Sequence, residues 1–418
     1  MPSVEGIGAR RAALQMLDGV LRQGLTLDAA AQNARGLATA DHALAIAIAG
    51  EALRRLPDLD ALIESATQRP LPPDSKARMV LRLALAQKVG LGTPDHALVA
   101  TALPLVDGGP RRLVHGVLGT LLRKGIPPLD APRLPDSVEQ RWRSAWGDEA
   151  VQAARRQIAR RPPLDLSFAD DSAATAYAQA HGGLSLAPRH VRLPESSAVP
   201  GLAGFGEGGW WVQDLAASLP ARLIPPDATD VLDLCAAPGG KTMQLAATGH
   251  RVTSVDASKN RLARIRENLQ RTKLSASLVP VDALTWDPGR SFDAILLDAP
   301  CSATGTFRRH PEVLYRARPQ VIADRAELQA KLLARAAQWL NPGGALVYSV
   351  CSLEPEEGEA IVTAFLAANP DFRLDPPAGL PDFIAPDVSG QVRILPGLLE
   401  DRGGLDGFFA ARLVRSGD

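Results

Sequence analysis

Three cysteines are the residues of this chain best suited to covalent chemistry, and each ends a strand-like apolar run. Cys235 ends "VLDLC", Cys301 follows "AILLDAP" and Cys351 follows "ALVYSV". A thiolate is a strong nucleophile where its surroundings lower its pKa, whereas a free cysteine is also an ordinary small core residue. Two cysteines at the ends of neighbouring strands favour chemistry for Cys301 and Cys351. We expect Cys235 to be a packing residue.

Aspartates also stand at the ends of strand-like apolar runs. Asp256, Asp282 and Asp298 follow the turn "AAPGGKT", in which Gly239 and Gly240 allow a ligand to approach the backbone closely. The turn is neither a GxGxxG motif nor a P-loop. Acids at several strand ends suit ribose hydroxyls, an exocyclic amine and a cationic group better than a pyrophosphate. The pattern predicts S-adenosylmethionine as the cofactor, in preference to aspartates that only cap helices.

The alternation of apolar runs and amphipathic segments from residue 228 onward predicts the fold that positions these side chains. We expect strands in "DVLDLCA", "RVTSVDAS", "ASLVPVDA", "FDAILLDAP" and "GALVYSVCSL", with helices between them, and a last strand in "GLDGFFAARLVRS". This pattern is typical of a doubly wound α/β fold with a parallel sheet. Ligands of such sheets bind at the carboxyl ends of the strands, where all three cysteines lie.

The N-terminal part has a different periodicity. Apolar residues recur at helical spacing from residue 8 to 125, and no strand-like alternation interrupts them. A proline-rich boundary follows at 125–137, and the region 160–210 is weakly patterned. We therefore expect an all-helical domain at 1–127, a helical and small α/β connector at 128–220, and an α/β catalytic domain at 221–418.

Composition sets limits on the class of protein. The 418 residues are 46% hydrophobic and 22% charged, with a formal net charge of zero. No apolar run approaches the roughly 18 residues that span a bilayer, and the cysteines form no CxxC pair. We expect a cytoplasmic monomer with no membrane segment, no metal site and no disulfide framework. The net charge neither indicates nor excludes a nucleic-acid partner.

Several motifs carry a family resemblance. "DLCAAPGGKT", "DAPCSATGTFRRHPE" and "YSVCSLEPEEGE" resemble, in order and spacing, the motifs of the RNA cytosine-5 methyltransferases of the Nop/Sun type. "ADHALAIAIAGEALRRL" and "RRLVHGVLGTLLRK" resemble the NusB-like RNA-binding domain of the bacterial RsmB (Sun/Fmu) branch. The resemblance implies a class I, Rossmann-like, S-adenosylmethionine-dependent methyltransferase domain that follows a NusB-like domain and acts on ribosomal RNA.

The resemblance also implies roles for individual residues. It makes Cys351 the nucleophile and Cys301 the cysteine that assists release of the product. The cofactor would be held by the turn and by the strand-end acids: Cys235, Ala236, Ala237, Pro238, Gly239, Gly240, Lys241, Asp256, Asp282 and Asp298.

The proposed chemistry explains why thiols are needed. Carbon 5 of cytosine is a poor nucleophile until a thiolate adds to carbon 6, which divides one difficult step into easier ones. The target base must leave its stack to reach a buried thiol, and Arg308, Arg309 and His310 are candidates to contact the RNA. Two alternatives remain open here: a transfer-RNA cytosine-5 methyltransferase, and a catalytically silent RNA-binding ribosome assembly factor. A third possibility exchanges the roles of the two cysteines, as in DNA cytosine methyltransferases.

Overall fold

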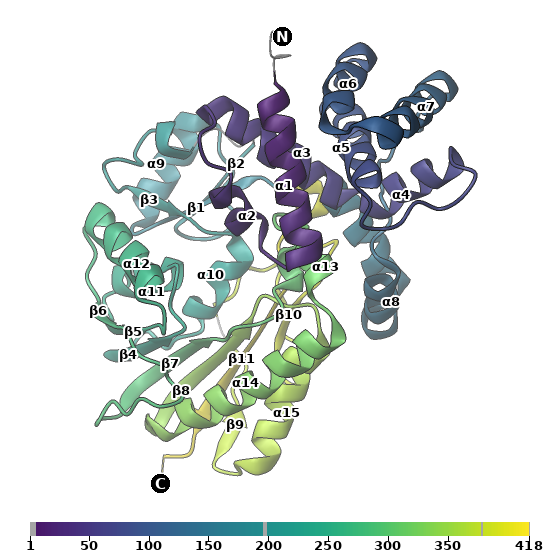
Figure 1. The fold of residues 1–418 in the computed structure, drawn as a ribbon. Coiled ribbons are helices and arrows are strands. Elements are labelled where there is room, and N and C mark those ends of the chain that lie inside the picture. Colours follow the sequence, from purple (N-terminus) through teal and green to yellow (C-terminus); the bar gives the residue numbers. More distant parts are fainter. Residues whose placement is uncertain (1–5, 195–198, 378, 418) are drawn as a thin grey trace. The chain divides into compact units, whose positions relative to one another are not determined.

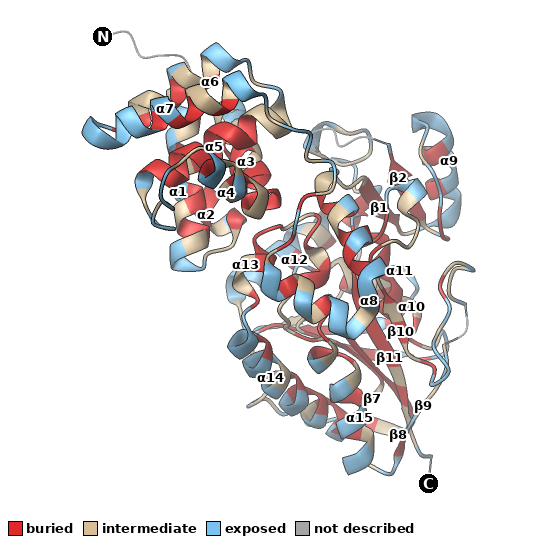
Figure 2. Cartoon of the chain, turned by 90° about the vertical axis from the view of Figure 1, so that its right-hand side faces the viewer, coloured by how far each residue is buried: buried red, intermediate tan, exposed pale blue. Residues whose placement is uncertain are grey.

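The computed structural model describes residues 6–194, 199–377 and 379–417, and Figure 1 shows its ribbon. The chain forms two compact units. The first unit comprises the chain up to Arg161 together with Phe307–Arg318, which we call the inserted segment, and the second comprises Pro162–Thr306 and the chain from Pro319 onward. Each unit has its own buried core (Figure 2). The division of function at residues 127 and 220 stays a prediction.

The first unit is helical, as the apolar periodicity predicts. Its elements are α1 (Ile7–Gln23), α2 (Leu27–Asn33), α3 (Thr39–Arg54), α4 (Leu56–Ser65), α5 (Lys76–Leu91), α6 (Asp95–Ala102), η1 (Leu103–Leu105), α7 (Gly108–Lys124), α8 (Asp136–Ala159) and α13 (Val313–Arg316).

Helix α5 is the centre of this unit. The Ser75 side chain caps its first turn by accepting from the Arg78 N–H, and Gly92 ends it in the left-handed conformation that favours glycine. Every residue from 77 to 87 is buried. Helices α1, α3, α4, α6 and α7 all pack against α5, so the helical core is built around one helix that is enclosed over its first three turns.

The inserted segment completes this helical core, although it comes from the middle of the catalytic motifs. The Phe307 ring packs edge-on against Trp142 of α8, with 5.4 Å between ring centroids. Glu312 accepts a hydrogen bond from the Leu27 N–H at 3.1 Å, and the Tyr315 hydroxyl donates to a carbonyl of α3 at 2.8 Å. The chain therefore leaves the second unit directly after the Cys301 loop and returns twelve residues later.

The second unit begins with a small antiparallel sheet of order β2-β1-β3, formed by β1 (Leu164–Phe168), β2 (His190–Leu193) and β3 (Trp210–Val212), which packs against α9 (Asp171–His181). The stretch "PPLDLSFAD" predicts β1, whereas the weak pattern of the rest of this region predicts neither β2 nor β3. A buried ion pair fixes the pairing, because Arg192 on β2 donates two hydrogen bonds of 2.7 Å to Asp165 on β1.

The larger sheet has eight strands, in the order β10-β11-β8-β7-β4-β5-β6 with β9 beside β11. Its strands are β4 (Asp230–Leu234), β5 (Arg251–Val255), β6 (Ser277–Val279), β7 (Phe292–Asp298), β8 (Leu340–Val350), β9 (Phe372–Leu374), β10 (Val392–Ile394) and β11 (Phe408–Arg415). The five predicted strands from β4 to β8 are confirmed and parallel. The sheet is mixed at one edge, because β11 runs antiparallel to β8 and pairs antiparallel with both β9 and β10.

Helices cover both faces of this sheet, namely α10 (Leu215–Arg222), α11 (Gly240–Ala247), α12 (Lys259–Thr272), α14 (Pro319–Gln338) and α15 (Glu359–Ala368). Alternate residues of one strand separate the two sides: Ile295 and Leu297 pack in the core with α14 and α15, while Ala294 and Leu296 pack in the core with α10. None of the helices in the described ranges is long and apolar enough to cross a bilayer. The parallel strands end at one edge, which brings the three cysteine positions and the strand-end acids to the same side.

The contacts of the inserted segment lead to a prediction for a fragment that begins at Pro162. Without the helical unit, Phe307 would lose its contact with Trp142 and Tyr315 its contact with the helical core, and newly exposed apolar side chains promote aggregation. We expect this fragment to aggregate when measured by size-exclusion chromatography with light scattering.

A matched fragment with residues 307–318 replaced by a Gly/Ser linker of equal length should be monodisperse, because its second-unit core is unchanged. Equal solubility of the two fragments would contradict the role of the inserted segment.

Candidate active site

The two cysteines predicted to do chemistry lie side by side. The Cys301 and Cys351 Sγ atoms are 3.5 Å apart, and both residues are partly exposed. Cys301 lies in the loop after β7, and Cys351 directly follows β8. The Gly305 N–H donates to the Cys351 carbonyl at 3.1 Å, which joins the two loops. The adjacency that the sequence predicts is therefore present as a close sulfur–sulfur contact.

The surroundings of Cys301 hold its thiol in the protonated form. The hydrogen bond with Cys351, together with burial, raises the pKa of the Cys301 thiol well above its usual value. Cys301 therefore keeps its proton at neutral pH and is suited to donate it toward Cys351. Burial raises the pKa of Cys235 to about 12, and its side chain packs against the sheet core. This environment agrees with the expectation that Cys235 is a packing residue.

The glycine turn connects β4 to α11. Gly239 has φ 101° and precedes the first residue of α11. A Cβ at Gly239 would lie 3.0 Å from the Ile265 side chain on α12, so glycine is required both by conformation and by space. The Ala237–Pro238 peptide bond is cis. The turn thus places the N-terminus of α11, with its free N–H groups, at the strand edge.

Asp256 is the acid most firmly held in the site. It directly follows β5, is 2% exposed, and accepts hydrogen bonds from the Ala237 N–H, the Ser258 N–H and the Arg261 guanidinium. These bonds connect the glycine turn to the start of α12. Asp282 differs, because it is exposed in the loop after β6 and its carboxylate accepts only from the Leu284 N–H among the bonds described.

Asp298 ends β7 and forms an ion pair with the turn. Its carboxylate accepts from Lys241 Nζ at 2.7 Å and from Ser349 Oγ at 3.0 Å. Lys241 Nζ also lies 5.4 Å from the centre of the Phe408 ring. The pair therefore connects β7, β8 and β11 to α11. Its acid, Asp298, lies three residues before Cys301 in the sequence.

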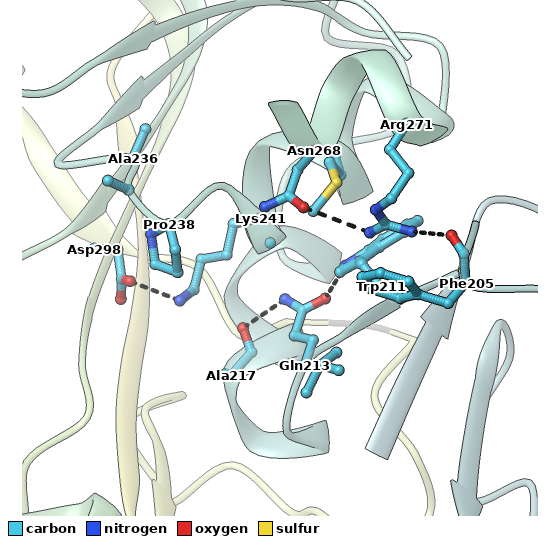
Figure 3. Close-up of a pocket in the computed structure, with 14 residues that line it drawn as sticks. Phe205, Trp211, Gln213, Ala217, Ala236, Pro238, Lys241, Asn268, Arg271 and Asp298 are labelled. Carbon is cyan, nitrogen blue, oxygen red and sulfur yellow. Dashed lines mark hydrogen bonds and ion pairs between the residues drawn. The ribbon is translucent and has the colours of Figure 1, made fainter. Parts of the chain in front are cut away.

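A cavity of about 320 Å³ adjoins the turn (Figure 3). Its walls include most of the predicted cofactor turn and Asp298, together with residues that the sequence analysis does not identify: Phe205, Trp211, Val212, Gln213, Ala217, Met243, Asn268 and Arg271. In Figure 3 the Gln213 amide accepts from Trp211 and donates to the Ala217 carbonyl. The volume of the cavity lies in the usual range for small-molecule sites.

The donor set at this edge fits S-adenosylmethionine. A methionine carboxylate suits the N-terminus of α11, ribose hydroxyls suit a buried carboxylate such as Asp256, and an adenine amine suits the exposed carboxylate of Asp282. Gly240 approaches Gln213 so closely that an added Cβ would lie 3.4 Å from its side-chain amide. Small residues therefore keep this side of the turn open.

The predicted RNA contact of Arg308 is wrong. Arg308 is 1% exposed, and its carbonyl accepts from Arg54 inside the helical unit at 2.7 Å. Proximity to the motif in the sequence suggests a surface loop, but Phe307 and the residues after it pack in the other unit's core. Arg309 and His310 are partly exposed.

A buried carboxylate beneath the cysteine loops is also absent from the sequence-based site. Glu357 accepts from Ser302 and Ser352, the residues that follow the two cysteines. The repeated Cys-Ser pair is a signal that could have identified it. Among the described residues, no group of three or more His, Cys, Asp or Glu side chains is placed to hold a metal ion.

Comparison with known proteins gives two family matches. Residues 220–414 match the family model described as 16S rRNA methyltransferase RsmB/F, and residues 8–123 match the NusB family. Two curated relatives carry the name "Ribosomal RNA small subunit methyltransferase B". The one from Xanthomonas campestris is 36% identical, covering 98% of each chain. The one from Thermus thermophilus is 37% identical, covering 90% of this chain and 89% of the relative.

One solved structure extends the likeness to the whole fold. The crystal structure of PH0851 aligns with a TM-score of 0.73 and 23% identity, covering 98% of this chain and 99% of the other. At that identity the likeness concerns the fold alone.

Asp233, behind the glycine turn, gives a pH-dependent prediction. It is fully buried on β4; Thr242 donates to one carboxylate oxygen at 2.5 Å, and the other oxygen has no hydrogen-bond partner among the described residues. Burial raises the pKa of Asp233 to about 7. Between its unfolded pKa of about 3.9 and this folded value, the unfolded chain loses the proton that the folded chain keeps. Stability therefore falls as pH rises through this window.

The side chain of Asp233→Asn cannot ionise. The melting temperature of this variant, relative to that of the wild type, should therefore increase between about pH 5 and about pH 7. Circular dichroism melts across pH measure this difference. The control is Asp230→Asn: Arg251 lowers the pKa of Asp230, so its stabilising charge is lost only at lower pH. Parallel wild-type and Asp233→Asn curves would contradict the assignment.

Proposed function

Since the chain belongs to the RsmB/F family of 16S rRNA methyltransferases, we propose that it methylates carbon 5 of a cytosine in small-subunit ribosomal RNA. The observation that carries the proposal is the pair of thiols 3.5 Å apart at the cofactor edge of the sheet. Transfer to an amine or a hydroxyl needs no sulfur nucleophile, whereas carbon 5 of cytosine needs one.

The environments of the thiols support the assignment of Cys351 as the nucleophile. Because the pKa of the Cys301 thiol is raised, Cys301 stays protonated while Cys351 is the sulfur that forms a bond to carbon 6. That bond places an electron pair on carbon 5. After carbon 5 is methylated, its proton goes to a base, the sulfur–carbon 6 bond breaks, and Cys351 leaves as a thiolate. Cys301 lies beside that bond and assists this release.

Residues of the chain itself position the cofactor and the target cytosine. S-adenosylmethionine supplies the electrophilic methyl group when it is bound. Residues 235–241 and Asp256 would hold it, with Asp282 at the adenine end. The Lys241–Asp298 pair holds a cation and a carboxylate fixed at 2.7 Å between the turn and the cysteine loops.

The proposed substrate is an unpaired or bulged nucleotide, because a stacked base does not reach the partly buried thiols. The NusB-family domain at residues 8–123 would supply further RNA contacts. We place the activity in the cytoplasm with ribosomal RNA, and in a monomer.

Methyl transfer from labelled cofactor to protein-free small-subunit ribosomal RNA tests the function. We expect label in 5-methylcytidine at one position, and bisulfite sequencing of ribosomal RNA from a deletion strain should lose protection at that position. Label in another nucleoside, or label in transfer RNA alone, would contradict the proposal.

Asp256→Asn should weaken cofactor binding. The change removes charge-assisted hydrogen bonds worth on the order of 1.5–3 kcal/mol, which corresponds to roughly a 10- to 100-fold loss of affinity. Isothermal titration calorimetry measures the affinity. Asp287→Asn changes an exposed acid that caps its own turn in the loop before β7; it is the control and should bind normally. An unchanged affinity for Asp256→Asn would remove Asp256 from the cofactor site.

Single substitutions separate the roles of the two cysteines. Cys351→Ala should abolish methylation and any covalent protein–RNA adduct, because no sulfur attacks carbon 6. Cys301→Ala should still attack but release slowly, so a cofactor-dependent adduct should accumulate on denaturing gels. Adducts formed by Cys351→Ala and not by Cys301→Ala would exchange the two assignments.

A further inference from the structure

The Glu357 carboxylate accepts hydrogen bonds from Ser302 and Ser352, the residues that directly follow the two cysteines. The Ser302 N–H donates to one Glu357 carboxylate oxygen at 2.8 Å, and the Ser302 hydroxyl donates to the other. The Ser352 hydroxyl donates to that second oxygen at 2.5 Å. Because Ser302 and Ser352 are adjacent to Cys301 and Cys351, three hydrogen bonds to one side chain join the two cysteine loops.

Glu357 is itself held rigidly. Gln329 of α14 donates to its carboxylate at 3.1 Å, and the same amide nitrogen donates at 2.9 Å to the carbonyl of Pro300, next to Cys301. The Tyr348 hydroxyl of β8 donates to the Glu357 backbone carbonyl at 2.6 Å. The carboxylate is thus fixed from a helix and from the strand that leads into Cys351.

The surroundings of Glu357 are costly for a carboxylate. The side chain is fully buried, and no ion pair with a cation is found for it among the described residues. A buried carboxylate with uncharged partners loses its hydration without a counter-ion. Four donors satisfy its two oxygens, which suits a group that only accepts hydrogen bonds.

We propose that Glu357 is a positioning residue that sets the distance and approach of the Cys301 and Cys351 thiols through Ser302 and Ser352. The inference rests on the proposed function and deepens it. Loops at strand ends otherwise relax independently, and a displacement of about 1 Å at a reacting group can cost on the order of 100-fold in rate. Nucleophilic attack needs Cys351 alone, whereas release needs both sulfurs close together, so loss of the link affects release first.

Three full-length variants test the proposal. Glu357→Ala removes every bond to the serines. Glu357→Gln keeps the shape: its oxygen accepts from the Ser302 N–H and Gln329, and its amide can donate to the serine hydroxyl oxygens. Glu356→Ala changes an exposed neighbour on the same short helix and is the matched control.

The first measurement is of thiol proximity and needs no RNA. A trivalent phenylarsenical binds tightly only where two thiols lie close enough to share the arsenic. We expect tight binding to the wild type, Glu356→Ala and Glu357→Gln, and binding by Glu357→Ala as weak as that by Cys301→Ala. Tight binding by folded Glu357→Ala would overturn the proposal.

The second measurement is of catalysis. Glu357→Ala should lose turnover by on the order of 100-fold while accumulating covalent RNA, and Glu357→Gln should restore release. The pH profile of Cys301 alkylation should shift to lower pH in Glu357→Gln, because the Glu357 charge is one cause of the raised pKa of that thiol, after its hydrogen bond with Cys351 and burial. Normal release by Glu357→Ala, or stalled release by Glu357→Gln, would count against positioning by geometry.

These outcomes distinguish the two levels of the argument. A wild-type protein without methylation or adduct would refute the proposed function, yet the arsenical result would still decide whether Glu357 holds the thiols together. If Glu357→Ala does not fold, the double variant Ser302→Ala with Ser352→Ala removes the same links and should give the same arsenical result. Wild-type arsenical binding by that double variant would overturn the proposal.

Discussion

The parallel register between β7 and β8 is the constraint on which the site depends. Asp298 pairs with Ser349 as the two strands end, so the loops that follow begin side by side and carry their cysteines within 3.5 Å of each other. A register shift of one residue would turn the side chains of one strand to the other face. Packing of alternate residues against helices on both faces fixes the register, and through it the chemistry.

Much of this arrangement could be predicted from the sequence, because it follows from local periodicity. Apolar runs between amphipathic segments identify the strands from β4 to β8, and the carboxyl-end rule then brings Asp256, Asp298, Cys301 and Cys351 together. The packing role expected of Cys235 follows from its place at the end of a buried strand, and its raised pKa agrees.

The parts that could not be predicted depend on tertiary contacts. Glu357 lies in an acidic run that suggests a solvated helix start, and its burial depends on Ser302 and Gln329, which are distant in the sequence. The cavity walls at Trp211 and Arg271 come from the small sheet and from α12, whose proximity no local pattern encodes. At the antiparallel edge, β11 is predicted as a strand but no local pattern encodes its direction, and β9 and β10 have only three residues each.

The inserted segment also sets an order of events during synthesis. The helical unit emerges first from the ribosome, but Phe307 and Tyr315, which pack against it, are made only after the small sheet and four strands of the larger one (β4 to β7) have been translated. Domains often fold in the order in which they are made. Here the packing of the N-terminal unit is completed only after residues 162–306 of the second unit have been made. A nonsense mutation before residue 307 would leave even this N-terminal unit incomplete.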